Sequence, residues 1–222
     1  MSLLWPVLLA IVIALVIGLV PISLRPATAT WFYGAIGVTT ASLSALALML
    51  VAIGYVTALP PVSAVAGWCP AIPVDHQVGW VVGVLALIGL WTISRRICRV
   101  VALRRWAVEG TEGKRLAVLQ TAEPVAYAAP GSPGCVVVSS GLLSMLEPRE
   151  RQVVFAHERA HLAQHHVRDW LVAELSTGVL PILAPLARRL RHAAERCADE
   201  GAGSSRGGDR DIVARAIARA AV

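Results

Sequence analysis

The first part of the chain is dominated by three apolar runs that carry no charged residue. Residues 3–20 form the first run, which ends before Pro21, residues 31–59 form the second, and residues 78–93 form the third. A helix crosses the ~30 Å hydrocarbon core of a bilayer with ~20 apolar residues. The lengths of the runs therefore predict three transmembrane helices within residues 1–97.

From Cys98 onward the pattern changes to short apolar segments separated by charged and turn-forming residues, which is typical of a folded domain in water. A Pro- and Gly-rich turn lies at 129–134, and β-branched residues follow it. The expected strands are 115–119, 124–128 and 135–139, and a short helix is expected at 141–146. The pattern thus predicts an α-helical membrane domain over 1–97 followed by a small α+β domain over 98–222.

The composition supports a membrane protein. Hydrophobic residues make up 56% of the 222 residues, and the mean hydropathy is +0.66, which is too high for an ordinary soluble domain. The formal charge is +6, from 20 Lys and Arg against 14 Asp and Glu. Because the arginines cluster beside apolar runs, we interpret them as flanking a lipid bilayer and expect no nucleic-acid partner. The four cysteines show no paired spacing, so no disulfide is expected.

Positive charge is distributed unequally between the predicted loops. Residues 60–77 contain no Lys or Arg, whereas an arginine cluster follows the third run. The cluster comprises Arg95, Arg96, Arg99, Arg104 and Arg105. By the positive-inside rule this cluster and the loop that carries Arg25 lie in the cytoplasm, which places the amino terminus outside. The first run lacks a basic leader and a clear cleavage site, so we expect it to be retained as a span.

A longer helix is expected to begin at Pro148 and to run to about His166. It contains the sequence His-Glu-Arg-Ala-His at 157–161, in which one helical turn separates the two histidines. Two imidazoles so placed can bind one zinc ion, and the carboxylate of Glu158 can remove a proton from zinc-bound water. The motif also occurs by chance as a surface pair, but its apolar neighbours favour a buried central helix.

A catalytic zinc site needs three protein ligands, so His157 and His161 require a partner. His165 lies on roughly the same face, but a continuous helix would carry it away from the ion. Glu195 is the better candidate. Asp199, one turn later on a predicted helix, is placed to accept the free N–H of a liganding histidine. The alternative is that this acidic pair is a solvated face of an arginine-rich helix.

This set of residues predicts the hydrolysis of peptide bonds. Zinc would lower the pKa of its bound water towards ~7 and polarise the scissile carbonyl. Glu158, which is not a ligand, would act as the general base and then pass the proton to the leaving amine. The substrate would lie extended along an edge strand, for which residues 135–139 are the candidate.

An apolar segment at 170–187 separates the histidines from Glu195. If it crossed the bilayer, Glu195 would lie ~30 Å from the histidines. Glu174 lies inside the segment, and Pro181 and Pro185 interrupt it. We therefore expect a buried helical hairpin, or one that dips into the membrane interface, and in either case the chain returns to the same side.

Three predicted spans followed by His-Glu-x-x-His, an apolar segment with proline, and Glu-x-x-x-Asp resemble the membrane metallopeptidases of the BlaR/MecR antirepressor type. The sequences Val-Val-Val-Ser-Ser-Gly-Leu-Leu at 136–143 and Leu-Glu-Pro-Arg-Glu-Arg at 146–151 are similar to actinobacterial members in particular. The related HtpX-type peptidases share the histidine motif and the later Glu. The resemblance implies a zincin-like (gluzincin) fold, with His157, His161 and Glu195 as zinc ligands and Glu158 as catalytic base.

The chain departs from these relatives at two places. Many of them carry an Asp where this chain has His166, and here Asp169 follows three residues later. The chain also has no histidine after His192 to stabilise an oxyanion. Tyr127, Arg206 and Arg210 remain the candidates for that role.

The sequence therefore predicts a multi-pass cell-membrane zinc endopeptidase whose catalytic domain lies in the cytoplasm. Its expected substrate is a cytoplasmic or membrane-associated protein, such as a regulator, and its expected cofactor is one Zn²⁺ ion. Two alternatives stay open. One is a catalytically silent membrane signalling module that keeps the fold, and the other is a transporter or scaffold whose histidines are incidental.

Overall fold

The computed structural model describes residues 4–60, 62 and 78–203. Most of the predicted loop at 60–77, with Cys69, lies outside these residues, as do Arg206 and Arg210. The α-helices are α1 (Leu4–Leu19), α2 (Pro26–Thr57), α4 (Trp80–Val108), α5 (Ser140–Met145), α6 (Pro148–Ala163), α7 (His166–Val179) and α8 (Ala184–Gly203). A short 3₁₀ helix, η1 (Pro181–Leu183), joins α7 to α8, and the strands are β1 (Leu116–Leu119), β2 (Ala126–Ala129) and β3 (Cys135–Ser139).

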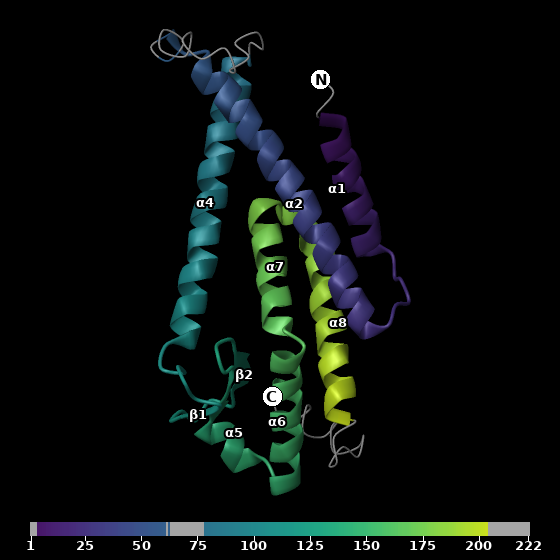
Figure 1. The fold of residues 1–222 in the computed structure, drawn as a ribbon, viewed down its shortest axis with the longest axis vertical. Coiled ribbons are helices and arrows are strands. Elements are labelled where there is room, and N and C mark those ends of the chain that lie inside the picture. The colour runs from purple at the N-terminus through teal and green to yellow at the C-terminus, as the bar shows by residue number, and fades with distance from the viewer. Residues whose placement is uncertain (1–3, 61, 63–77, 204–222) are drawn as a thin grey trace.

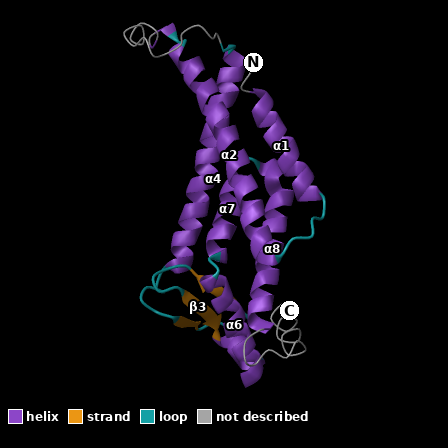
Figure 2. Cartoon of the chain, turned by 45° about the vertical axis from the view of Figure 1, so that its right-hand side comes forward, coloured by secondary structure: helices purple, strands orange, loops and turns teal. Residues whose placement is uncertain are grey.

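The described part of the chain is mostly helical, with a small sheet at one end. The α7–α8 hairpin rises between α4 and α1 and ends well short of the far ends of α2 and α4 (Figure 1). The sheet and α6 lie together at the opposite end of the molecule (Figure 2). The polar motifs of the sequence are therefore gathered at one end of a bundle of apolar helices.

Two of the described helices, Pro26–Thr57 and Trp80–Arg105, are long and apolar enough to cross a membrane. The first predicted span forms α1, an apolar helix of 16 residues, which is shorter than a typical span. Large apolar side chains on these helices are exposed, among them Leu9 on α1, Leu46 on α2 and Leu85 on α4. Exposed apolar surface along long helices is what association with a membrane requires.

The hairpin packs closely against α1 and α2. A Cβ atom on Gly18 of α1 would lie 2.7 Å from the backbone nitrogen of Leu186 on α8, so only glycine permits this approach. The guanidinium of Arg189 donates to the carbonyls of Gly18 and Leu19, each at 3.2 Å. Those carbonyls end α1 and have no partner inside the helix, so Arg189 of α8 caps α1.

The apolar segment at 170–187 forms the helical reversal that its prolines predict. α7 ends at Val179, Pro181 begins the 3₁₀ turn, and α8 runs back antiparallel. Leu183, Leu186 and Leu190 are buried against α1 and α2. The charge inside the segment is also paired, because Glu174 Oε2 lies 3.3 Å from Arg104 Nε of α4. Glu195 is thereby returned to the end of the molecule that carries the histidines.

The three strands form one sheet in the order β1-β3-β2. β1 is parallel to β3 and β2 is antiparallel to it, with Val137 of β3 opposite both Ala117 and Tyr127. Every residue of β3 is buried. The prediction that 135–139 is an edge strand for substrate is therefore wrong, because both hydrogen-bonding edges of β3 are already paired. The edge strand that contacts α6 is β2.

Helix α6 begins as its sequence predicts but ends earlier. Glu147 and Glu150 form a capping box, in which the Glu147 backbone N–H donates to Glu150 Oε2 at 2.9 Å, and Pro148 occupies the first turn. The helix ends at Ala163 and not at about His166. His165 adopts a left-handed conformation (φ 58°), which breaks the helix and starts α7 in a new direction.

Candidate metal centre

Three side chains from two helices converge at the end of the molecule opposite the hairpin turn. The Nε2 atoms of His157 and His161, one turn apart on α6, lie 3.0 Å from each other. Glu195 of α8 lies with Oε2 at 3.4 Å from His157 Nε2 and 3.7 Å from His161 Nε2. These three are the described residues whose ligand atoms lie close enough together to hold one metal ion.

The separations of these atoms fit a divalent metal. Three ligands at ~2.0–2.1 Å from a tetrahedral zinc ion lie about 3.4 Å apart, close to the three distances measured here. Two imidazole nitrogens at 3.0 Å also need a cation or a proton between them, because their lone pairs repel each other. Two imidazoles and one carboxylate are one of the ligand sets found in catalytic zinc sites. The residues present therefore fit a metal ion.

Each histidine has a partner on the ring nitrogen that faces away from this triangle. Asp199 Oδ1 lies 3.1 Å from Nδ1 of His157, although the N–H is not aligned on the carboxylate. Nδ1 of His161 lies 3.0 Å from Nδ1 of His166, the first residue of α7. Such outer partners fix which nitrogen of a liganding histidine carries the proton.

The electrostatics of the triangle favour a charged carboxylate beside two imidazoles. Hydrogen bonds from His157 and His161 hold the pKa of Glu195 down to about 2. Burial alone would lower the pKa of His157, but Glu195, Glu158 and Asp199 together raise it above its usual range. Burial and the neighbouring His161 lower the pKa of His166 to about 4, so its ring is neutral at pH 7.

The side chain of Glu158, which follows His157 on α6, is buried. Burial raises the pKa of its carboxyl, while the charges of His161 and His157 lower it. A carboxylate in such an environment has a pKa nearer to neutrality than a solvated one, which suits a general base.

The family model described as Peptidase family M48 matches residues 94–221, more than half of the protein. The chain belongs to peptidase family M48. M48 peptidases depend on a metal, and the His157, His161 and Glu195 group is positioned to bind one.

Individual M48 relatives match a shorter segment. A "Protease HtpX homolog" of Listeria monocytogenes serotype 4b (strain CLIP80459) is 35% identical over 85 residues, covering 37% of this chain and 28% of the relative. One from Dictyoglomus thermophilum (strain ATCC 35947 / DSM 3960 / H-6-12) is 32% identical over 93 residues, covering 41% of this chain and 31% of the relative. The match thus spans less than a third of these relatives' length. No solved structure matches this chain.

The structure brings together most of the site residues that are predicted from the sequence of this M48 chain. It also places one further residue, His166, against them. His157, His161, Glu195 and Asp199 are close together, whereas His165 is exposed at the left-handed turn and is not in the group. The position of His166 against His161 was not predicted, because a continuous helix was expected there. The local signal was the departure at this position from the pattern that the resemblance implies, which has an Asp there.

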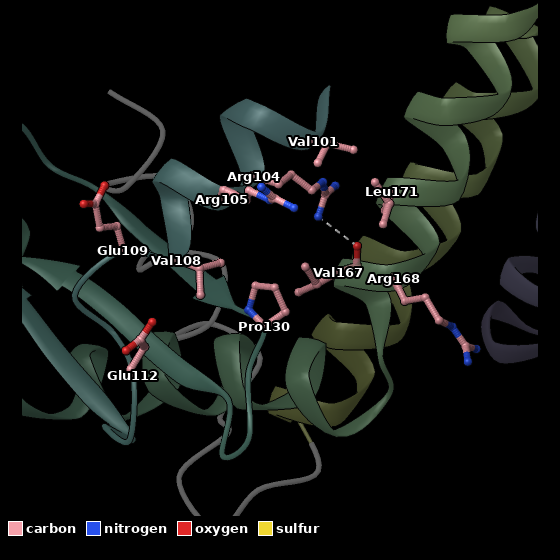
Figure 3. Close-up of a pocket in the computed structure, with 10 residues that line it drawn as sticks. All are labelled: Val101, Arg104, Arg105, Val108, Glu109, Glu112, Pro130, Val167, Arg168 and Leu171. Atoms are coloured by element: carbon pink, nitrogen blue, oxygen red, sulfur yellow. Dashed lines mark hydrogen bonds between the residues drawn. The ribbon is translucent and has the colours of Figure 1, made fainter. Parts of the chain in front are cut away.

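A cavity of about 620 Å³ lies beside the centre rather than at it. It is bounded by the end of α4, the turn at Pro130 and the start of α7, and Arg104 reaches across it to donate to the carbonyl of Val167 at 3.1 Å (Figure 3). Neither the three ligand residues nor Glu158 lines it. Its relation to the centre is through Val167, the residue after His166.

Proposed function

We propose that this M48 protein is a membrane-embedded zinc endopeptidase in which His157, His161 and Glu195 hold the zinc ion. The observation that carries the proposal is the triangle of ligand atoms, with sides of 3.0, 3.4 and 3.7 Å, beside the buried Glu158. Three protein ligands leave a fourth position for water, as in catalytic rather than structural zinc sites.

The side chains around the triangle have separate roles in this proposal. Bound zinc would acidify a water molecule and polarise the scissile carbonyl. Glu158 takes the proton from that water on its carboxylate and then donates it to the nitrogen of the leaving amine. Asp199, whose Oδ1 lies 3.1 Å from Nδ1 of His157, is placed to take the Nδ1 proton once the N–H aligns on it, which would keep Nε2 free as a ligand.

The substrate would bind in an extended conformation along β2. The Ser139 N–H donates to the Val125 carbonyl at 2.8 Å, so Val125 faces β3. Backbone groups alternate in direction along an antiparallel strand, so those of Ala126 and Ala128 face the free edge of the described sheet. A peptide added at that edge would lie beside α6 and its motif.

The proposal places α1, α2 and α4 across the membrane, with the amino terminus outside and the catalytic domain in the cytoplasm. The residue assignment is 1–97 for the membrane domain and 98–222 for the peptidase domain, with α4 running across the boundary. The proposed orientation is supported by the arginines near the end of α4 and by the lack of Lys and Arg in residues 60–77.

We also propose a role of the BlaR/MecR type, in which the enzyme cleaves a cytoplasmic or membrane-associated regulator. The sequences at 136–143 and 146–151 support this assignment. The match to relatives that are named proteases supports peptide hydrolysis. The alternative is a signalling module that binds metal without cleaving.

The test compares the wild-type protein with Glu158→Gln, which keeps the shape of the side chain and removes the base. Both are purified in detergent, analysed for zinc, and assayed on an unfolded protein substrate. We expect near-equal zinc content and a loss of cleavage of ~10²–10⁴-fold in the variant. Glu200→Gln, an exposed residue of α8, is the matched control and should retain activity. Equal turnover by wild type and Glu158→Gln would refute catalysis, and zinc without turnover in wild type would favour the signalling module.

A further inference from the structure

His166, the first residue of α7, is buried against His161. Only 1% of the surface of His166 is exposed to solvent, and its Nδ1 lies 3.0 Å from Nδ1 of His161. The left-handed turn at His165 makes this contact possible, because it ends α6 and swings the start of α7 back over the helix. The two rings meet edge to face, with centroids 5.1 Å apart.

The tautomers of the two rings follow from the geometry. Nε2 of His161 points at His157 and Glu195, so metal binding needs it unprotonated. A neutral His161 then carries its proton on Nδ1 and donates it to Nδ1 of His166. His166 must in turn carry its own proton on Nε2. A neutral imidazole can do this because it has one donor and one acceptor nitrogen.

We propose that His166 is the positioning residue for His161: it accepts the Nδ1 proton of that ligand and fixes the ring with Nε2 towards the metal. This inference rests on the proposed function, since it takes His161 to be a metal ligand. The arrangement makes the two histidine ligands unequal. His157 faces the half-exposed carboxylate of Asp199, whereas His161 faces a buried neutral ring.

The burial of His166 gives a physical reason for an imidazole at this place. The ring of Trp170 lies 4.7 Å from that of His161, and Val167 is also buried. A carboxylate in such surroundings would lose much of its hydration, whereas a neutral acceptor loses far less. His166 thus supplies the hydrogen bond without placing a second outer carboxylate beside the ligands.

The experiment measures the zinc dissociation constant of the purified full chain by competition with a chelator. His166→Leu removes the acceptor at similar volume, and we expect zinc binding to weaken ~10–100-fold. His166→Asn can place its amide oxygen where Nδ1 stood, and should bind within about threefold of wild type, which a purely space-filling role would not predict. His165→Asn, an exposed neighbour that tolerates the left-handed turn, is the matched control and should not change the constant.

The outcomes separate this inference from the proposed function. Equal dissociation constants for wild type and His166→Leu would overturn the inference alone, as would an Asn variant as weak as the Leu variant. A wild-type protein that does not bind zinc would refute the proposed function itself. If His166→Leu does not fold, His166→Gln replaces it, because its amide reaches the Nε2 position and not Nδ1. The Co²⁺ absorption spectrum of each variant reports the geometry at the ligands independently of activity.

Discussion

Nε2 of His157 lies 3.4 Å from Oε2 of Glu195, although α7, η1 and the first part of α8 separate the two residues along the chain. The hairpin therefore makes the centre possible: it leaves the polar end of the molecule, turns at Pro181, and returns on α8. Without that reversal the chain would offer two histidines and no third ligand. The first prediction tests this contact directly.

Replacing Glu195 by Gln keeps the size of the side chain and removes its charge. Neutral amides are poorer zinc ligands than carboxylates, so we expect zinc affinity to fall by more than ~100-fold, beyond the loss caused by removing an outer partner. Chelator competition measures the change, and Glu200→Gln on the same helix should leave affinity unchanged. Unaltered zinc binding in Glu195→Gln would mean that the third ligand lies elsewhere.

Zinc binding should weaken in acid because protons compete for the histidines. The pKa of His157 is raised, so its protonated form persists to a higher pH than that of a free histidine. We expect affinity to fall by about tenfold per pH unit for the displaced proton, beginning above the ordinary value of 6.5. Glu195 has a pKa of about 2 and stays ionised over this range, so it contributes no further loss.

The pH dependence can be measured by zinc titrations between roughly pH 5.5 and 8, with proton release followed in weak buffer. Asp199→Asn removes a charge that raises the pKa of His157, and should move the onset of weakening to lower pH. An onset that does not move would show that Asp199 does not act on His157 in solution.

The packing of α1 against α8 should depend on the absence of a side chain at Gly18. A methyl group there would lie 2.7 Å from the backbone nitrogen of Leu186, so Gly18→Ala must push the helices apart. We expect the free energy of unfolding to fall by ~1–3 kcal/mol. Gly34→Ala on α2 is the matched control, since nothing lies within 4 Å of its added methyl group. Thermal unfolding in detergent compares the two, and equal stabilities would contradict the close approach.

The segment that follows α4 and the later part of α8 should lie on the same side of the membrane. A reporter enzyme fused after Glu112, which follows α4, and one fused after Ala193 on α8 should both give the cytoplasmic signal. The reason is that η1 reverses the chain between α7 and α8. An extracellular signal after Ala193 alone would separate Glu195 from the histidines by the bilayer and contradict the proposed centre.

The sequence alone determined the features that depend on local pattern. The apolar runs at 31–59 and 78–93 predict long helices, and Glu147, Pro148 and Glu150 predict where α6 begins, because capping groups act within one turn. The spacing of His157 and His161 fixes two ligands on one helix face. Glu195 and Asp199 could be nominated because they too are one turn apart on one helix.

The tertiary structure decided what depends on residues that are distant in sequence. Strand order was one such feature: the β-branched pattern of 135–139 fits any buried strand, and only the pairing with both β1 and β2 shows that it is central. The end of α6 was another, because no residue near His165 forbids a helix, and the break follows from packing α7 against its neighbours. The contact of His166 with His161 exists only because of that break. The periodicity of a helix or strand can be read from the sequence, whereas the contacts between separate elements depend on the packing of the whole chain.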